Sequence, residues 1–476
     1  MSMTADQYSW PPDAPEDWRS WKIDSRPDRA PGQTVAFRTR QMPESLDDLR
    51  EDSRWPAFFP SPLCLVTTGD GRRACLEKVV GASIVNRFPY VMALSFCRES
   101  LSPRHHVRRH FMETLEQGGS AAVQFLPPGR ALDTAMREIL TTDEASSHER
   151  LRHAGLPTSA ACGSDTPVFD EAYLVYEGRL VQPAQDFESR PIFAAPWQDV
   201  GSHRIYFLEI TAVQLRRDIA LGQSQICWTS LPAWRPERMP SGATQRETGA
   251  PRAAYQKSFT PHYRFPAATT VAFEADEFVS GRAVRHLPHE TAKQVERDND
   301  RARWPCFFPS SVGMITTETT DGRPNLMPCG STTIVSRHPL VIAPCVSYAA
   351  INARYAPRAT LEQIRRTGRF GCGVPYISDN VLEAIRYAGN ISWQADPDKI
   401  RTAGLTVDPQ SATPRLLELP IHFDCEVRGE VRLGTHSMFL GEVRRISVRE
   451  DVSSERPLQW NPWPGIAPVE SLARCA

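Results

Sequence analysis

Residues 303–310 of the chain read RWPCFFPS, and residues 54–61 read RWPAFFPS. The two octapeptides differ at one position and start 249 residues apart. A period of that length is far longer than a solenoid repeat and has the size of a whole domain. The sequence therefore predicts two tandem copies of one domain, in which this stretch is scaffold and contributes Trp304 and Phe308 to a core.

Outside the octapeptides, the segment TVAF begins at Thr34 and again at Thr270, which marks the start of each copy. The residues before the first copy hold five prolines, and those between the copies hold six. Proline-rich segments favour extended arms and linkers over folded elements. We therefore expect a four-part chain: an arm at 1–33, a first domain at 34–230, a linker at 231–266 and a second domain at 267–476.

The composition excludes several classes of protein. Fifty-five basic and 56 acidic side chains give a formal net charge of -1, so we expect no nucleic-acid partner. The 11 cysteines are scattered and form no CxxC pair, which favours a reducing compartment over a disulfide framework. No apolar run approaches the roughly 20 residues of a membrane helix. These features predict a cytoplasmic protein without a membrane partner.

The apolar runs of both copies are short and bounded by turn residues. Residues 63–68 lead to Asp70-Gly71, and residues 312–317 lead to Asp321-Gly322, as in β-hairpins. A short helical segment at 360–367 precedes Gly368, which is a plausible C-cap. Long helices do not alternate with the strands. The fold class we predict is mainly β with short helices, with each copy forming a small antiparallel barrel.

Residues 316–339 read TTETTDGRPNLMPCGSTTIVSRHP, followed later by RATLEQIRRTGRF from Arg358. This order of DGxxN, a small hydroxyl-rich segment, V-S-x-x-P and R-x-T resembles the flavin reductase-like family, the FMN-binding split barrels. Later landmarks of that family match at Asp398-Lys399, at 403–405 and at 433–443. The resemblance covers about residues 300–450.

The resemblance implies two tandem split β-barrels. Because members of the family usually bind FMN at a homodimer interface, the two copies are expected to form a pseudo-dimer within one chain, which leaves further homodimerisation open. It implies an FMN-dependent oxidoreductase that reduces flavin or a small organic substrate. FAD is the alternative cofactor, NAD(P)H the transient donor, and a monooxygenase a partner in some members. A non-flavin split barrel, either a haem-binding enzyme or a ligand-binding module, is the other reading, with His338, His436 and Cys329 as candidate axial ligands.

A flavin phosphate needs backbone N–H groups, hydroxyls and a cation. Gly330, Ser331, Thr332 and Ser336 could supply the first two, and Arg337 or Arg358 the third, although serine- and glycine-rich segments between strands are often plain turns. Residues 325–328 could line the flavin ring. The cofactor-binding candidates are Asn325, Leu326, Met327, Pro328, Cys329, Gly330, Ser331, Thr332, Ser336, Arg337, Arg358 and Thr360.

The first copy departs from this pattern. Its corresponding stretch at 74–81 reads ACLEKVVG, which lacks the asparagine and places Glu77 where it would repel a phosphate. We therefore expect one FMN site, with its phosphate loop in the second copy and one wall from the first.

Both copies keep a histidine near the end, His203 and His436, and these are the catalytic candidates, with a plain strand-end hydrogen bond as the alternative role. The basic stretch at 104–110 could bind an anionic substrate or form a solvated helix face. His105, His106 and His110 lack an acidic or cysteine ligand to complete a set, so no metal site is predicted.

Overall fold

The computed structural model describes residues 27–28, 34–38, 61–98, 108–216, 226–231, 270–274, 312–348, 358–449 and 466–468, with short gaps inside the longer ranges. The repeated octapeptides, apart from Ser61, lie outside these residues, and so does the predicted core role of Trp304 and Phe308. Nearly all of the predicted arm and linker lies outside them as well.

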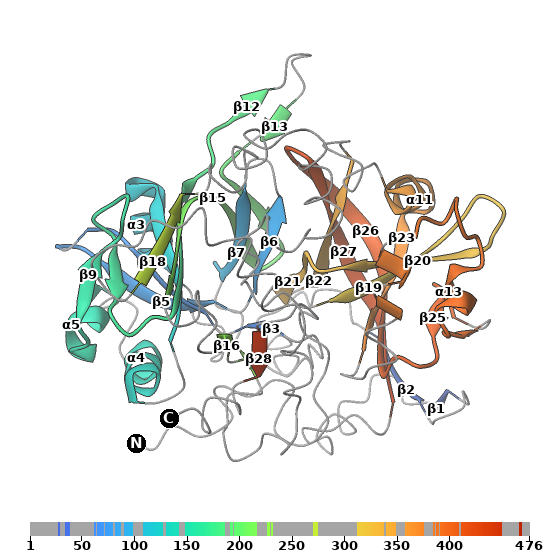
Figure 1. Ribbon diagram of the computed structural model, residues 1–476, viewed down its shortest axis with the longest axis horizontal. Coiled ribbons are helices and arrows are strands. Elements are labelled where there is room, and N and C mark those ends of the chain that lie inside the picture. Colours follow the sequence, from blue (N-terminus) through green and yellow to red (C-terminus); the bar gives the residue numbers. More distant parts are fainter. Residues whose placement is uncertain are drawn as a thin grey trace.

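Each copy forms one curled antiparallel sheet (Figure 1). The first sheet has the order β5-β4-β8-β11-β15-β7-β6, and the pairings of the second follow the same path as β20-β19-β23-β26-β27-β22-β21. In each sheet the two end strands are consecutive in sequence but do not pair within the described residues, which is the opening of a split barrel. The predicted fold class, mainly β with two tandem split barrels, is confirmed.

The bounds of the barrel strands agree closely between the copies. The first barrel contains β4 (Cys64–Thr68), β5 (Cys75–Val79), β6 (Gly81–Asn86), β7 (Val91–Cys97), β8 (Ser120–Phe125), β11 (Leu174–Leu180) and β15 (His203–Arg216). The second contains β19 (Gly313–Glu318), β20 (Pro324–Cys329), β21 (Thr332–Arg337), β22 (Leu340–Ser347), β23 (Arg369–Val374), β26 (Ile421–Leu433) and β27 (His436–Arg449).

Short helices pack onto these sheets. They are α3 (Arg109–Gly118), α4 (Arg130–Thr141), α5 (Arg150–Ala154), α11 (Ala359–Thr367) and α13 (Lys399–Thr402). Helix α11 buries Leu361 and Ile364 in the second barrel, and it ends where Gly368 adopts φ +65° and donates its N–H to the Ile364 carbonyl. The predicted C-cap is thus confirmed, because glycine enters this left-handed region without strain. No helix among the described residues is long and apolar enough to cross a membrane.

The remaining strands are short additions to the two barrels. They are β1 (Pro27–Asp28), β2 (Thr34–Arg38), β3 (Ser61–Pro62), β9 (Thr158–Ala160), β10 (Pro167–Phe169), β12 (Ala184–Gln185), β13 (Pro191–Phe193), β14 (Trp197–Val200), β16 (Ile226–Trp228), β17 (Ser230–Leu231), β18 (Thr270–Glu274), β24 (Val407–Asp408), β25 (Arg415–Leu416) and β28 (Ile466–Pro468).

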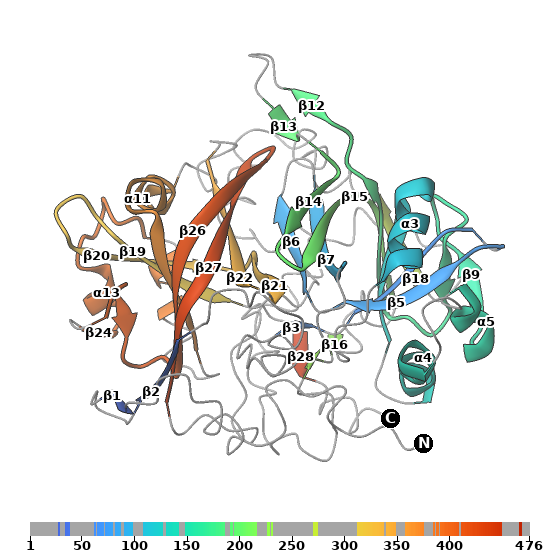
Figure 2. The same ribbon diagram turned by 180° about the vertical axis from the view of Figure 1, so that it is seen from behind.

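The two TVAF strands are exchanged between the copies. Strand β2 precedes the first barrel but pairs with β27 of the second, with Thr34 opposite Arg449. Strand β18 precedes the second barrel but pairs with β15 of the first, with Thr270 opposite Arg216. Both views show β2 beside the second barrel and β18 beside the first (Figures 1 and 2). Each sheet is therefore completed by the TVAF strand that stands at the start of the other copy.

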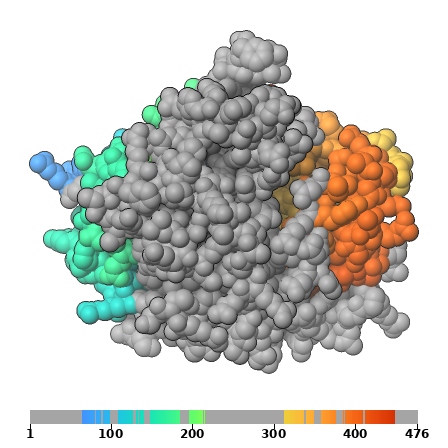
Figure 3. Space-filling view, viewed as in Figure 1, coloured from blue at the N-terminus to red at the C-terminus, as the bar shows by residue number. Residues whose placement is uncertain are grey.

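The two barrels meet along an apolar seam made by β6 and β7 on one side and β21 and β22 on the other. Its buried members include Val85, Val91, Val335 and Val341. Burying a side chain of this size stabilises the folded state by about 1.5–3 kcal/mol. The seam lies between the described parts of the two barrels, which form opposite sides of the molecule (Figure 3). This arrangement is the expected intramolecular pseudo-dimer.

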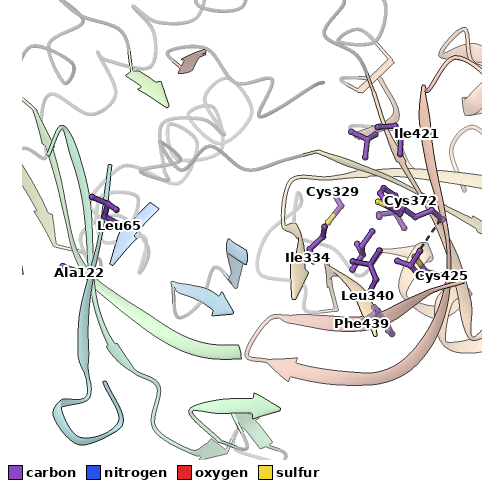
Figure 4. Close-up of a cluster of buried hydrophobic side chains, with 14 of the residues drawn as sticks. Leu65, Ala122, Cys329, Ile334, Leu340, Cys372, Ile421, Cys425 and Phe439 are labelled. Atoms are coloured by element: carbon purple, nitrogen blue, oxygen red, sulfur yellow. Dashed lines mark hydrogen bonds between the residues drawn. The ribbon is translucent and has the colours of Figure 1, made fainter. Parts of the chain in front are cut away.

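A second set of buried apolar side chains has members in both barrels. In the second barrel, side chains from several strands gather around Cys329, Leu340, Cys372 and Phe439, whereas Leu65 belongs to the first barrel on the opposite side of the view (Figure 4). These side chains are almost completely buried. The cysteines serve here as small apolar residues, because burial raises the pKa of the Cys372 thiol and keeps it protonated.

The barrels approach closely at Gly81, where a Cβ atom would lie 2.7 Å from the Ile334 carbonyl oxygen across the seam and 2.9 Å from Ser95 Cβ on the neighbouring strand β7. Replacement Gly81→Ala is expected to force the barrels apart locally and to lower the free energy of unfolding by about 1–3 kcal/mol. Gly118→Ala is the matched control, because a Cβ there meets nothing within 4 Å. Thermal unfolding of both variants measures the difference, and equal melting temperatures would contradict the assigned seam.

Candidate functional site

The strand ladders define which residues of the two copies correspond. Asn325 lies opposite Thr317 in the second barrel, as Cys75 lies opposite Thr68 in the first. Two residues further along the same strands, Met327 corresponds to Glu77. Arg358 precedes α11 and donates its backbone N–H to Ser347, as Arg108 precedes α3 and donates to Cys97. Lys399 and Arg150 are the first residues of α13 and α5.

A buried amide network joins β19, β20 and α11. Asn325 Nδ2 donates to Thr360 Oγ1 at 3.2 Å and to Gln363 Oε1 at 2.6 Å, and Thr317 Oγ1 donates to the same Gln363 oxygen at 2.6 Å. The structure thus brings two predicted residues, Asn325 and Thr360, into contact. Asn325 Oδ1 is buried and accepts no hydrogen bond within the described part of the chain. Because such an acceptor is costly to bury, a ligand N–H donor would be stabilising there.

The turn between β20 and β21 contains the predicted hydroxyl-rich segment. Thr332 Oγ1 donates to the Cys329 carbonyl at 2.9 Å, and the Ser331 carbonyl accepts from the Cys345 N–H at 3.0 Å. These bonds fix the turn. The Thr332 hydroxyl proton is already donated to the Cys329 carbonyl and is not available to a phosphate. Gly330 is exposed and Ser331 is half-buried, which leaves their backbone and the Ser331 hydroxyl at the surface of the turn.

Two cations, Arg358 and Lys399, interact electrostatically with each other, and Arg358 also acts on Cys329 at the end of β20. The positive charge of Arg358 partly offsets the effect of burial on the pKa of Cys329, which burial raises. Lys399 is only 4 % exposed, and its ammonium donates to the Ile391 carbonyl at 3.3 Å. Burial and the repulsion of Arg358 lower the pKa of Lys399, and the attraction of Asp396 opposes them. The resulting pKa is about 8. Two mutually repelling cations in one place favour the binding of an anion.

The first copy has the same two cations but supplies its own anion. Glu77 is fully buried and forms salt bridges with Arg108, at 2.9 Å, and with Arg150. Met327, at the corresponding position of the second copy, carries no charge. The sequence-based expectation that Glu77 repels a phosphate is sharpened by this geometry, because the carboxylate also pairs with both arginines and offsets one of their two positive charges.

The two candidate catalytic histidines occupy equivalent hairpin positions. His436 follows Gly434 and Thr435 and pairs with Ser347, the residue that accepts the Arg358 N–H. His436 therefore lies in the same part of the second barrel as the cation. His203 pairs with Cys97 in the first barrel and belongs to the neighbourhood of Arg108.

The other predicted residues are divided between core and surface. Leu326 packs into a separate apolar cluster with Ile400 and is scaffold, and Met327 is buried in the barrel core. Pro328 is half-buried. Ser336 is fully buried, and its Oγ has no hydrogen-bond partner among the described residues.

Three further predictions cannot be placed, because they lie outside the described residues: the Arg337 side chain, His338 and residues 104–107. Of the three histidines considered and rejected as metal ligands only His110 is described, and no group of three or more His, Cys, Asp or Glu side chains in the described ranges could hold a metal ion.

Sequence reasoning missed three residues of this site. Gln363 lies in the predicted helix without an assigned role. Its position three residues after Thr360 indicates that both side chains lie on the same helix face. Lys399 was noted as a family landmark and not as a site residue. Asn86, in the first copy, contacts the His436 hairpin across the seam, and no local pattern marks it.

The comparisons with known proteins agree with this fold. The flavin reductase-like domain profile matches residues 57–230 and 305–462, so the chain belongs to this family and contains two copies of its domain. No curated protein matches the chain.

Three solved structures illustrate the likeness. Flavoredoxin of Desulfovibrio vulgaris (Miyazaki F) is 24 % identical, with 30 % of this chain and 70 % of that chain covered and a TM-score of 0.25. Nitrilotriacetate monooxygenase component B from Bacillus cereus is 22 % identical, with 35 % and 82 % covered and a TM-score of 0.27. The 2-nitrobenzoate 2-nitroreductase NbaA of Pseudomonas fluorescens is 19 % identical, with 30 % and 66 % covered and a TM-score of 0.25.

The buried triad of the first copy gives a direct test of its electrostatics. Glu77→Gln leaves two buried arginines without a carboxylate, so the free energy of unfolding should fall by about 3–5 kcal/mol. Glu209→Gln removes the partly exposed pair with Arg179 and should cost about 0–1 kcal/mol. Chemical denaturation compares the two variants. A loss for Glu77→Gln no larger than that of its control would show that the triad does not balance these charges.

Proposed function

We propose that this chain is an FMN-dependent oxidoreductase that reduces flavin or a small organic substrate, with NAD(P)H as the electron donor. The observation that carries the proposal is the difference between the two copies: in the first, Glu77 forms salt bridges with both Arg108 and Arg150, whereas the second has Met327 at that position. Family membership, which is independent of this comparison, supports flavin as the anionic ligand.

The residues of the second copy fit such a ligand. Arg358 and Lys399 supply positive charge for a phosphate, and the Gly330–Ser331 turn offers backbone N–H groups and a hydroxyl. Asn325 Oδ1 offers a buried acceptor to a ring N–H, and Ser336 Oγ is a second buried polar atom with no partner in the described ranges. Hydrogen bonds from Asn325 to Thr360 and Gln363 fix the orientation of its amide before a ligand arrives.

When bound, a flavin would supply the two-electron redox chemistry, for which a dihydronicotinamide would be the hydride donor and a proton the second reactant. The protein binds and orients the reactants and handles the proton. His436 is the group we assign to that proton, because it lies opposite Ser347 beside Arg358 and because imidazole exchanges protons near neutral pH. Thiol chemistry is not assigned, since burial raises the pKa of Cys329.

The first test is the absorption spectrum of the purified chain, followed by titration with FMN. One flavin per chain is expected, together with loss of its oxidised bands on anaerobic addition of NADH or NADPH. A Soret band, or no flavin binding at all, would overturn the proposal. Binding of two flavins would refute the single-site assignment and leave flavin chemistry standing.

The positive charge of Lys399 should be needed for flavin binding. Lys399→Gln is expected to weaken FMN binding about tenfold or more, because a charge-assisted contact contributes about 1.5–3 kcal/mol. Arg401→Gln is the matched control: it removes the same charge from the same helix, but Arg401 is exposed and pairs with Asp398. Fluorescence titration measures both. Equal weakening in the two variants would point to overall charge and not to a site.

Flavin binding should also depend on pH. Since the pKa of Lys399 is lowered to about 8, the side chain is charged below that pH and neutral well above it. A bound phosphate favours the charged form and raises the pKa, so affinity should be highest below about pH 8 and fall progressively above it. Lys399→Gln should abolish this alkaline decline. Persistence of the decline in that variant would assign it to another group.

A further inference from the structure

The His436 hairpin is held from the other copy. The backbone N–H of Thr435 donates to Asn86 Oδ1 at 2.9 Å, and Thr435 Oγ1 donates to the same oxygen at 2.8 Å. Thr435 Oγ1 in turn lies 2.8 Å from His436 Nδ1. All three side chains are buried, with at most 9 % exposure, and Asn86 reaches them from β6 of the first barrel.

The donor and acceptor of each of these three hydrogen bonds follow from one group that can only donate, the backbone N–H of Thr435. A backbone N–H can only donate, so the amide atom of Asn86 that faces it must be the oxygen, not the nitrogen. That oxygen cannot donate, so the Thr435 hydroxyl must give its single proton to it. The hydroxyl then has only lone pairs for His436, and Nδ1 must carry the proton.

We propose that Asn86 of the first copy is a positioning residue that fixes His436 in the Nδ1–H tautomer. Protons then enter and leave the neutral ring at Nε2 alone. For the reaction this rests on the proposed function, in which His436 handles the flavin-linked proton. The divergent first copy thus supplies a part of the second copy's site.

The molecule contains its own comparison. In the first copy, Ser202 Oγ lies 2.8 Å from His203 Nδ1, so the hydroxyl–histidine pair is retained. The residue that corresponds to Asn86 is Ser336, at the same place on β21 before the turn to β22. Its hydroxyl makes no hydrogen bond among the described residues, so it does not orient the Ser202 hydroxyl. Ser336 therefore does not exert on His203 the constraint that Asn86 exerts on His436.

The test is nitrogen NMR of the histidine side chains in the 15N-labelled full-length chain at about pH 9, where unperturbed imidazoles are neutral. Of the 12 histidines, His436 is assigned by its absence in His436→Gln. The wild-type ring should show a protonated Nδ1 and an unprotonated Nε2. Asn86→Ser should shift His436 toward a mixture of tautomers, whereas Asn86→Asp, which keeps an oxygen acceptor for both donors, should retain Nδ1–H.

Ser336→Ala is the matched control and should change the tautomer of neither His436 nor His203. A wild-type Nε2–H tautomer, or an unchanged His436 in folded Asn86→Ser, would overturn the proposal. If Asn86→Ser does not fold, the wild-type tautomer itself decides, because an Nε2–H ring would contradict the bond directions that Asn86 imposes. The measurement needs no flavin, so a chain that shows the expected tautomer but binds no flavin would refute the proposed function alone. With flavin reduction established, Asn86→Ser should slow it by about 2- to 10-fold, less than the roughly 100- to 10,000-fold that a proton-transfer group as a whole contributes, because the ring stays present and only its tautomer is mixed.

Discussion

The apolar seam between the two barrels is the constraint on which the rest of the structure depends. Strands β6 and β7 pack against β21 and β22 so closely that Gly81 leaves no room for a Cβ, and Ser95 Oγ donates to the Val335 carbonyl across the seam at 2.6 Å. This contact places β6 of one copy next to the hairpin that carries His436. Without it, the second barrel would keep its cations and its turn but lose the Asn86 contact. The pseudo-dimer is therefore part of the site as well as of the fold.

Gene fusion of two such domains removes the requirement that both halves stay alike. In a symmetric dimer, a change at an interface residue appears on both sides of the seam. Here Asn86 and Ser336 occupy corresponding positions yet differ, and so do Glu77 and Met327. In the first barrel a buried carboxylate pairs with both arginines, whereas the second has the uncharged Met327 at the position of that carboxylate.

The sequence predicts the fold well because the repeat and the short alternating runs are local signals. The mainly β fold class, the C-cap at Gly368 and the tandem arrangement of two barrels can be predicted from these signals. Within the site, Asn325 and Thr360 both belong to the predicted cofactor-binding residues, and the structure brings them into contact. The pairing of Glu77 with Arg108 and Arg150 could not be predicted, because the three residues are distant in sequence and meet only when α3, β5 and α5 pack. The exchange of β2 and β18 is equally nonlocal, since either copy offers an edge of the same chemistry.

That exchange has a consequence for how the chain folds during synthesis. The first barrel cannot complete its sheet until β18 has left the ribosome, more than fifty residues after β15 ends at Arg216. Strand β2, made near the start, waits for β27, which ends at Arg449. Such long-range pairing slows folding and leaves unpaired edges exposed in the meantime. Neither half is a natural unit for excision, because a cut between the copies removes one strand from each sheet.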